Sequence, residues 1–208
     1  MKLMSLFNIR SEHAQNHPFI GVVDLSISKE NMIKYEPVDL KRTDDITPEV
    51  LTSFVSAFAN KELTPILKSD PEPTSPAPKD LPILALNTHT FKTVFGDYPD
   101  KDIFIFFAGP ACFNCNAVWP SFELTVRALH EGSKSLLFAY VDLTYNELQE
   151  YAVVYSFPSI RLYPKNENPE RPEKREVAIN FEEQPEYSYF KSFLMKHVKG
   201  GEIVADPT

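Results

Sequence analysis

The stretch Asp102-Ile-Phe-Ile-Phe-Phe-Ala-Gly-Pro-Ala-Cys-Phe-Asn-Cys115 decides how this chain folds. Its uniformly apolar part, residues 103–107, predicts a strand that is buried on both faces of a sheet. Behind the two cysteines, apolar side chains recur at the spacing of a helix, at Val118, Phe122, Val126 and Leu129. The only two cysteines of the chain therefore stand between a buried strand and the start of a helix.

Cys112 and Cys115 are in the arrangement that thiol–disulfide exchange requires. A helix N-terminus carries a partial positive charge, which favours a thiolate over a thiol. The Cys-x-x-Cys spacing puts the second sulfur within reach of the first, so that it can resolve a mixed disulfide. We expect Cys112, nearer the helix start, to be the nucleophile and Cys115 the resolving thiol. Two alternatives stay open: a relic pair on a binding domain, and half of a zinc site, although a closed zinc site needs four ligands.

The composition excludes several classes of protein. With 208 residues, 43% of them hydrophobic and 12% aromatic, the chain is long and apolar enough for one or two packed domains. A formal net charge of −8 argues against a nucleic-acid partner. No run approaches the ~20 apolar residues that span a bilayer, so no membrane partner is predicted. No cofactor or metal is predicted either. The ends show neither a signal peptide nor a retention signal, so taken alone the chain looks cytosolic.

Prolines at positions 71, 73, 76 and 78 predict an inter-domain linker over residues 67–79. It separates residues 1–66 from a second domain, residues 80–200, and a tail, residues 201–208. In the second domain we expect an α/β fold, with a mixed sheet and helices on both faces. Besides 103–107 and the helix after the cysteines, its expected strands are 81–86, 135–141, 159–163 and 175–179, and its expected helices are 90–95, 144–152 and 187–197. Thr144 and Glu147 read as a capping box for the helix 144–152.

The first segment is too short to close a sheet. Residues 19–24 and 31–35 predict two strands of a hairpin, and Thr47 predicts the N-cap of a helix. The apolar stripe of that helix is Val50, Leu51, Phe54, Val55 and Phe58. Because two strands and one helix cannot cover both faces of a sheet, this segment looks like half a domain. We expect it to expose apolar surface unless it docks on something.

At this point the residues resemble the protein disulfide isomerase family. The stretch Phe106-Phe-Ala-Gly-Pro-Ala-Cys-Phe-Asn-Cys-Asn-Ala-Val-Trp-Pro120 resembles the active-site region of its catalytic domains, and Tyr155-Ser-Phe-Pro-Ser-Ile-Arg161 resembles the loop that carries a cis-proline, here Pro158. The linker is similar to the joint before the last catalytic domain. Residues 1–66 resemble the C-terminal half of a non-catalytic thioredoxin-like domain, with His17-Pro18 at its cis-proline position.

The resemblance implies a thioredoxin fold for the second domain and a thiol–disulfide oxidoreductase or isomerase acting on folding polypeptides. Its partners would be unfolded or misoxidised polypeptides and glutathione or an oxidoreductase partner. Its location would be the lumen of the endoplasmic reticulum. The missing targeting signals conflict with that location, and we expect the chain to be a fragment or truncated product of a longer protein. The rival functions are a redox-poor chaperone or binding module and a cytosolic thioredoxin-like reductase.

The departures from the family pattern lower the expected activity. The family's Gly-His pair between the cysteines is Phe113-Asn114 here, so the charge that stabilises the thiolate is missing. The tryptophan before the first cysteine is Ala111, and Gly109 looks like a one-residue insertion. The buried acid that assists proton transfer falls at Ile105, or at Phe106 if the insertion is placed earlier, and the arginine near the cis-proline falls at Tyr155. We expect a weak oxidant with slow turnover.

Three residues are candidates for contact with substrate. Beside a Cys-x-x-Cys, the cis-proline loop would leave the backbone before Pro158, at Phe157, free to pair with an extended chain. The alternative is a purely structural proline. Phe113 should lie at the exposed turn, where its ring could contact unfolded polypeptide; the alternative is a tolerated surface residue.

Overall fold

The computed structural model describes residues 6–7, 18–25, 33–37, 45–148, 151–165 and 178–198. The chain divides into two compact units, Met1–Lys68 and Ser69–Thr208. Within the described residues, the first unit contains a sheet of two strands and the second a sheet of five.

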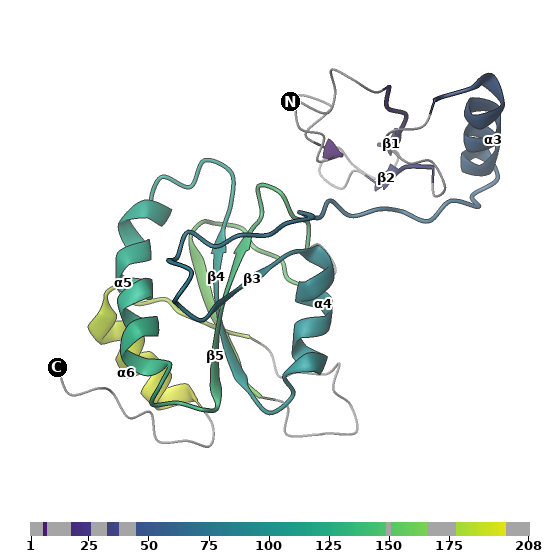
Figure 1. Cartoon of the computed structure of the whole chain (residues 1–208). Helices are drawn as coiled ribbons and strands as arrows, with labels where there is room; N and C mark the ends of the chain where they lie inside the picture. The colour runs from purple at the N-terminus through teal and green to yellow at the C-terminus, as the bar shows by residue number, and fades with distance from the viewer. Residues whose placement is uncertain are drawn as a thin grey trace. The chain divides into compact units, whose positions relative to one another are not determined.

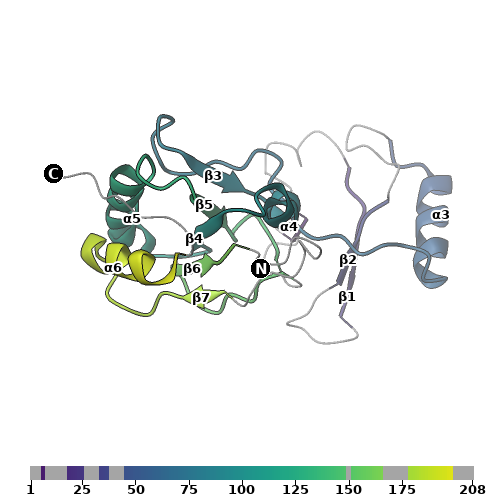
Figure 2. The same cartoon turned by 90° about the horizontal axis from the view of Figure 1, so that it is seen from below.

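The second unit is built on a mixed sheet with strand order β3-β5-β4-β6-β7. Three strands are parallel, and the last two run antiparallel to their neighbours. The strands are β3 (Ile83–Leu86), β4 (Asp102–Ala108), β5 (Leu136–Asp142), β6 (Ser159–Tyr163) and β7 (Ile179–Asn180); the helices are α4 (Thr88–Asp97), α5 (Cys115–Leu129) and α6 (Tyr187–His197). Helices α5 and α6 cover one face and α4 the other (Figures 1 and 2). The mixed sheet with helices on both faces is as predicted.

Strand β4 lies in the middle of the sheet, and its side chains alternate between two cores. Phe104 and Phe106 pack on the face of α5 and α6, whereas Ile103, Ile105 and Phe107 pack on the face of α4. All five are at most 1% exposed. The uniform apolar run follows from this burial on both faces, and it ends where the chain turns toward the cysteines.

The helix expected over residues 144–152 is wrong. Within the described part of this segment, residues 143–145 form a turn and 146–148 have no regular structure. The backbone N–H of Thr144 donates to Asp142 Oδ1, and that of Glu147 donates to Thr88 Oγ1. Polar side chains thus compete with helix formation for the backbone groups, and one comes from a distant segment that sequence spacing could not reveal.

Three other helices and strands begin a few residues away from the positions that the sequence predicts. Helix α4 runs from Thr88 rather than 90, because Asn87 caps it in a reciprocal pair with Thr90. Strand β3 begins at Ile83 rather than 81. Strand β7 begins at Ile179, where the expected strand ended; residues 175–177 lie outside the described residues.

The first unit contains the expected hairpin and helix. Strands β1 (Val22–Asp24) and β2 (Ile33–Tyr35) pair antiparallel, and helix α3 (Pro48–Ala59) follows. Thr47 is its N-cap, accepting a hydrogen bond from the backbone N–H of Val50, as predicted. Of the apolar stripe, Phe54 is buried but Leu51 and Val55 are exposed. The His17-Pro18 position falls partly outside the described residues, so its expected cis bond stays a prediction.

In the described ranges, none of the helices is both long and apolar enough to cross a bilayer. The same ranges hold no group of three or more histidine, cysteine or acidic side chains placed to bind a metal ion.

Candidate functional site: a disulfide at the start of a helix

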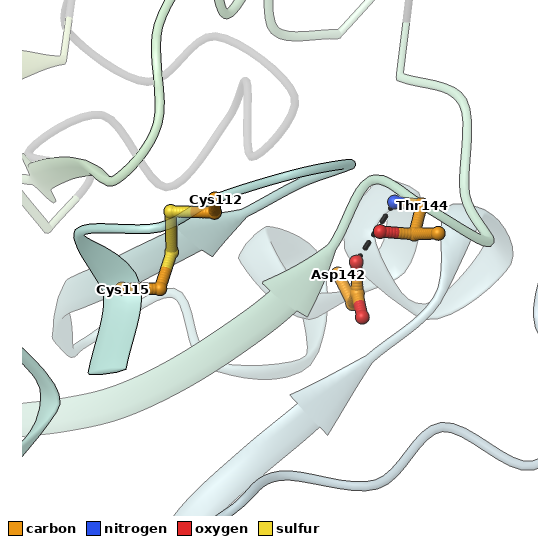
Figure 3. The surroundings of a disulfide bond; sticks show 4 residues. All are labelled: Cys112, Cys115, Asp142 and Thr144. Carbon is orange, nitrogen blue, oxygen red and sulfur yellow. Dashed lines mark hydrogen bonds between the residues drawn. A yellow bond between two sulfur atoms is a disulfide. The ribbon is translucent and has the colours of Figure 1, made fainter.

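Cys112 and Cys115 are joined in a disulfide, with 5.4 Å between their Cα atoms. Cys112 lies in the loop after β4, and Cys115 is the first residue of α5 (Figure 3). Asp142, the last residue of β5, is the register partner of Ala108 at the end of β4. The two predicted sulfurs are therefore bonded to each other at the edge where β4 and β5 both end.

The backbone around the cysteines is tightly turned. The N–H of Cys112 donates to Gly109 O, and the N–H of Cys115 donates to Cys112 O, both at 3.3 Å. Ala111 has φ 57°, a left-handed conformation that residues with a Cβ rarely adopt. Asn114 is the N-cap residue of α5, but its side chain makes no capping hydrogen bond. The turn thus places the disulfide at the N-terminus of α5, where the positive end of the helix macrodipole stabilises a thiolate.

The structure shows on which face of the sheet each of the two candidate positions for the buried acid lies. Phe106 belongs to the core against which Cys115 packs, whereas Ile105 lies in the core on the opposite face of the sheet. The residue on the cysteine side is therefore Phe106, a side chain that cannot accept a proton. Of the two positions left open by the sequence, only Phe106 shares a core with Cys115.

An aromatic cluster surrounds Phe106 on this face. Its ring centroid lies 5.2 Å from Trp119 and 6.2 Å from Tyr140, and Trp119 lies 5.5 Å from Tyr140. The Trp119 Nε1 is buried without a hydrogen-bond partner. Burial raises the pKa of Tyr140, and the nearby Asp142 and Tyr145 raise it further. The Tyr140 phenol therefore stays neutral at physiological pH and is no substitute for the missing acid.

The loop before β6 lies beside the cysteine loop. The Phe157–Pro158 peptide bond is cis, as predicted, and Ser159 pairs with Phe107 of β4. The Phe157 ring packs against Gly109 so closely that a Cβ on Gly109 would come within 2.3 Å of it. The sequence suggested only an insertion at Gly109; the structure shows a position where a Cβ would force the Phe157 ring to shift.

Arg161 holds this loop from inside the sheet. Its Nη2 donates to Val153 O at 2.7 Å, its Nε donates to Ser159 Oγ, and its guanidinium lies 5.4 Å from the Phe107 ring centroid. Tyr155, at the position of the missing arginine, is 93% exposed. The Arg161 guanidinium is thus engaged in contacts with this loop and with β4.

Phe113 is 89% exposed, as expected for the turn between the cysteines. Sequence reasoning missed two features of the site: the packing of Phe157 on Gly109, and the buried Asn146, which organises the loop after β5. An asparagine inside a segment with helical spacing was the available signal, but its partners lie far away in the sequence.

Comparison with known proteins agrees with the expected fold. A family model described as Thioredoxin matches residues 82–182. Human protein disulfide-isomerase A2 is 28% identical over 162 residues, 78% of this chain and 28% of that protein. Protein disulfide-isomerase from Oryctolagus cuniculus is 28% identical over 203 residues, 93% of this chain and 36% of that protein. The chain thus spans about a third of the length of these relatives. Among solved structures, a J-Trx1 fragment of ERdj5 matches with a TM-score of 0.47 and 19% identity, covering 58% of this chain and 54% of that one.

Proposed function

Residues 82–182 of this chain are a thioredoxin domain, the chain is homologous to the protein disulfide-isomerases, and from this premise we propose that it catalyses thiol–disulfide exchange in folding polypeptides. The observation that carries the proposal is the Cys112–Cys115 disulfide at the N-terminus of α5. At that position the positive end of the helix stabilises a thiolate. The second sulfur is close enough to resolve a mixed disulfide.

The proposed reaction begins from the reduced site. The Cys112 thiolate attacks one sulfur of a substrate disulfide, and the other substrate sulfur leaves as a thiolate. In isomerisation, that substrate thiolate or another attacks the mixed disulfide and frees Cys112 unchanged. In reduction, Cys115 attacks the Cys112 sulfur, the second substrate thiolate leaves, and the site is left oxidised by two electrons.

Phe113, Phe157 and Pro158 are the proposed substrate contacts. Phe113 lies between the two cysteines in the sequence, and its ring is exposed. Phe157 and Pro158 lie in the loop that packs on Gly109, three residues before Cys112. An extended substrate segment crossing Cys112 would meet these side chains first.

The proposed enzyme is a weak oxidant with slow turnover. Asn114 carries no charge to stabilise the Cys112 thiolate, and about 1.4 kcal/mol of lost stabilisation lowers a two-electron potential by about 30 mV. Phe106, on the side of Cys115, cannot accept a proton. Tyr155 stands where the family has its arginine, so that positive charge is missing as well. A redox-poor chaperone or binding module is the second candidate, and these same three residues favour it.

The proposed partners are unfolded or misoxidised polypeptides, with glutathione or another oxidoreductase to reset the site. The proposed location is the lumen of the endoplasmic reticulum, by analogy with the family that the residues resemble. The partners and the location are both part of the proposed function.

Reactivation of disulfide-scrambled ribonuclease in a glutathione buffer tests the function. We expect the wild-type chain to restore activity and Cys112→Ala to abolish this, with circular dichroism checking that each variant is folded. Loss in Cys115→Ala as well would mean that escape through the resolving thiol is needed, whereas retention would mean that Cys112 suffices. A wild-type chain no better than Cys112→Ala would sink the isomerase and leave the binding module.

A further inference from the structure

Trp119, the single tryptophan of the chain, carries a buried hydrogen-bond donor. Its Nε1 finds no hydrogen-bond partner among the residues that the structure describes. A buried donor without an acceptor costs free energy, so such a group in a folded protein calls for an explanation. The reaction proposed above does not use it.

Helix α5 places Trp119 beside Cys115. The two residues are four positions apart, so they lie on the same face of the helix, about one turn from each other. Both pack against the core on the α5 and α6 face of the sheet. Side chains on a helix lean toward its N-terminus. The indole therefore extends over the first turn of α5, which begins at Cys115.

Two aromatic rings hold the indole at the end of the sheet that carries the disulfide. Phe106 and Tyr140 each stand two residues before the end of their strand. Their ring centroids lie 5.2 and 5.5 Å from Trp119, and both rings meet the indole edge to face. Neither side chain accepts a hydrogen bond from Nε1. The Cys115 sulfur becomes a much stronger acceptor when the disulfide opens, because it can then carry a negative charge.

We propose that Trp119 Nε1–H donates a hydrogen bond to the Cys115 thiolate when the disulfide is open, which makes Trp119 a catalytic residue of the resolving step. In this step the Cys115 thiol loses its proton to solvent. The thiolate then attacks the Cys112 sulfur of the mixed disulfide, a Cys112–Cys115 bond forms, and the substrate leaves as a thiolate. The indole keeps its own proton throughout.

This role differs from that of the missing buried acid. Phe106 cannot accept the proton of Cys115, and the indole N–H cannot accept it either. Trp119 instead stabilises the thiolate after the proton has left, so more of Cys115 is in the reactive form at neutral pH. The inference deepens the proposed function and rests on it, because a resolving step needs a disulfide that reacts.

The single indole allows a direct test by nuclear magnetic resonance. In the full chain, Cys112→Ser leaves Cys115 as the only thiol, and Cys115→Ser leaves Cys112. The resonance of Trp119 Nε1–H is followed in both variants from about pH 6 to about pH 10, a range that spans ordinary thiol ionisation. We expect the proton signal to move downfield as Cys115 ionises in Cys112→Ser, and to stay in place in Cys115→Ser.

The second variant is also the control for other titrating groups. Tyr140, Asp142 and Tyr145 are titratable side chains around this end of β5. They are present in both variants, so any effect that they have on the indole appears in Cys115→Ser as well. Only a shift confined to Cys112→Ser belongs to Cys115.

Alkylation of Cys115 by iodoacetamide gives a second measurement. Near pH 7 the reaction of Cys112→Ser/Trp119→Phe should be about tenfold slower than that of Cys112→Ser, because a hydrogen bond to a charged group is lost. The two rates should converge at high pH, where all of Cys115 is thiolate. Phe122→Leu in the Cys112→Ser chain loosens the same aromatic cluster but removes no donor, so its rate near pH 7 should stay within about twofold. Circular dichroism checks that each variant is folded.

Two results would overturn the hydrogen bond. One is an indole signal that stays in place in Cys112→Ser or moves equally in Cys115→Ser. The other is an alkylation rate that Trp119→Phe lowers by the same factor at all pH values, which would mean altered access to Cys115.

The proposed function can fail separately. Ribonuclease reactivation with an indole signal that does not respond would overturn this inference alone. A responding indole in a chain that does not reactivate ribonuclease would overturn the proposed function and the catalytic role of Trp119, while the hydrogen bond itself would stand.

Discussion

Asn114, between the two cysteines, is the residue that most affects the expected redox potential. It precedes the first residue of α5, and its side chain makes no capping hydrogen bond that a substitution would break. Its amide is neutral, so the reduced site gains no charge–charge stabilisation from it. The potential should therefore be adjustable at this one position.

Asn114→His should make the disulfide a stronger oxidant. A protonated imidazole beside Cys112 stabilises the thiolate of the reduced form, so the potential should rise by about 30 mV for each 1.4 kcal/mol gained. Equilibration with glutathione, read by fluorescence of the single tryptophan, Trp119, measures it. Asn114→Gln, which changes size without charge, is the control. A potential that is unchanged near pH 6, where the imidazole is charged, would contradict the prediction.

Tyr140 should make the free energy of unfolding depend on pH in the alkaline range. Burial raises its pKa first, and the Asp142 carboxylate adds to the shift, so the folded chain keeps this proton where the unfolded chain, with a pKa of about 10, loses it. Its contribution is complete below about pH 10 and is lost as pH rises through the folded value. Burial raises the pKa of Tyr163 too, so part of the dependence belongs to that residue.

Tyr140→Phe should therefore weaken the loss of stability in alkali. Urea midpoints between about pH 9 and about pH 11 should fall less steeply than in the wild-type chain. Tyr189→Phe, an exposed tyrosine on α6, should keep the wild-type slope. Identical slopes for Tyr140→Phe and the wild-type chain would mean that Tyr140 does not retain its proton.

At the scale of elements, the loop after β5 is organised by Asn146, which is 3% exposed. Its Oδ1 accepts from the backbone N–H of Asp70 at 2.9 Å and of Thr88 at 3.1 Å, and its Nδ2 donates to Asp142 O at 2.9 Å. The carbonyl of Asp70 accepts from Asn87 Nδ2. One amide thus joins the start of the proline-rich segment, the start of α4 and the end of β5.

Asn146→Ala should lower the free energy of unfolding by about 1–3 kcal/mol, because it leaves buried backbone groups without a partner. Urea unfolding measures this, and protease cleavage within residues 69–79 should become faster. Asn116→Ala, at an exposed position of α5, should stay within about 0.5 kcal/mol of the wild-type chain. An unchanged midpoint in Asn146→Ala would show that the loop and linker hold without the amide.

At the scale of the whole molecule, the two units differ in how well their apolar side chains are covered. The second has a continuous core on each face of its sheet. In the first, the buried apolar side chains among the described residues are Leu6, Phe7 and Phe54, while Leu51 and Val55 on α3 are exposed. Burial of apolar surface is the main source of stability, so the first unit should be the weaker one.

Limited proteolysis of the whole chain should cut residues 1–66 before the thioredoxin domain. A protease needs a locally unfolded segment, and such openings are more frequent where few apolar contacts are buried. A time course of fragment masses would reveal a persistent product that contains residues 80–200. Cleavage of the two regions at the same rate would mean that the first segment folds adequately as it stands.

The amino-acid sequence by itself determined the elements that depend on neighbouring residues. The apolar run of β4, the helical spacing of α5, the Thr47 cap and the cysteine pair are local patterns, and the structure confirms them. The cis bond at Pro158 was predicted from the resemblance of its loop to a known one.

Tertiary structure alone decided what depends on segments far apart in the chain. The apparent capping box at Thr144 failed because Thr88, 59 residues from Glu147, takes that N–H. Only the pleat of β4 could assign Phe106, rather than Ile105, to the side of Cys115. Only packing reveals that the Phe157 ring fills the space above Gly109. Local patterns specify which element forms, but which side chains meet at its ends depends on how the chain returns to them.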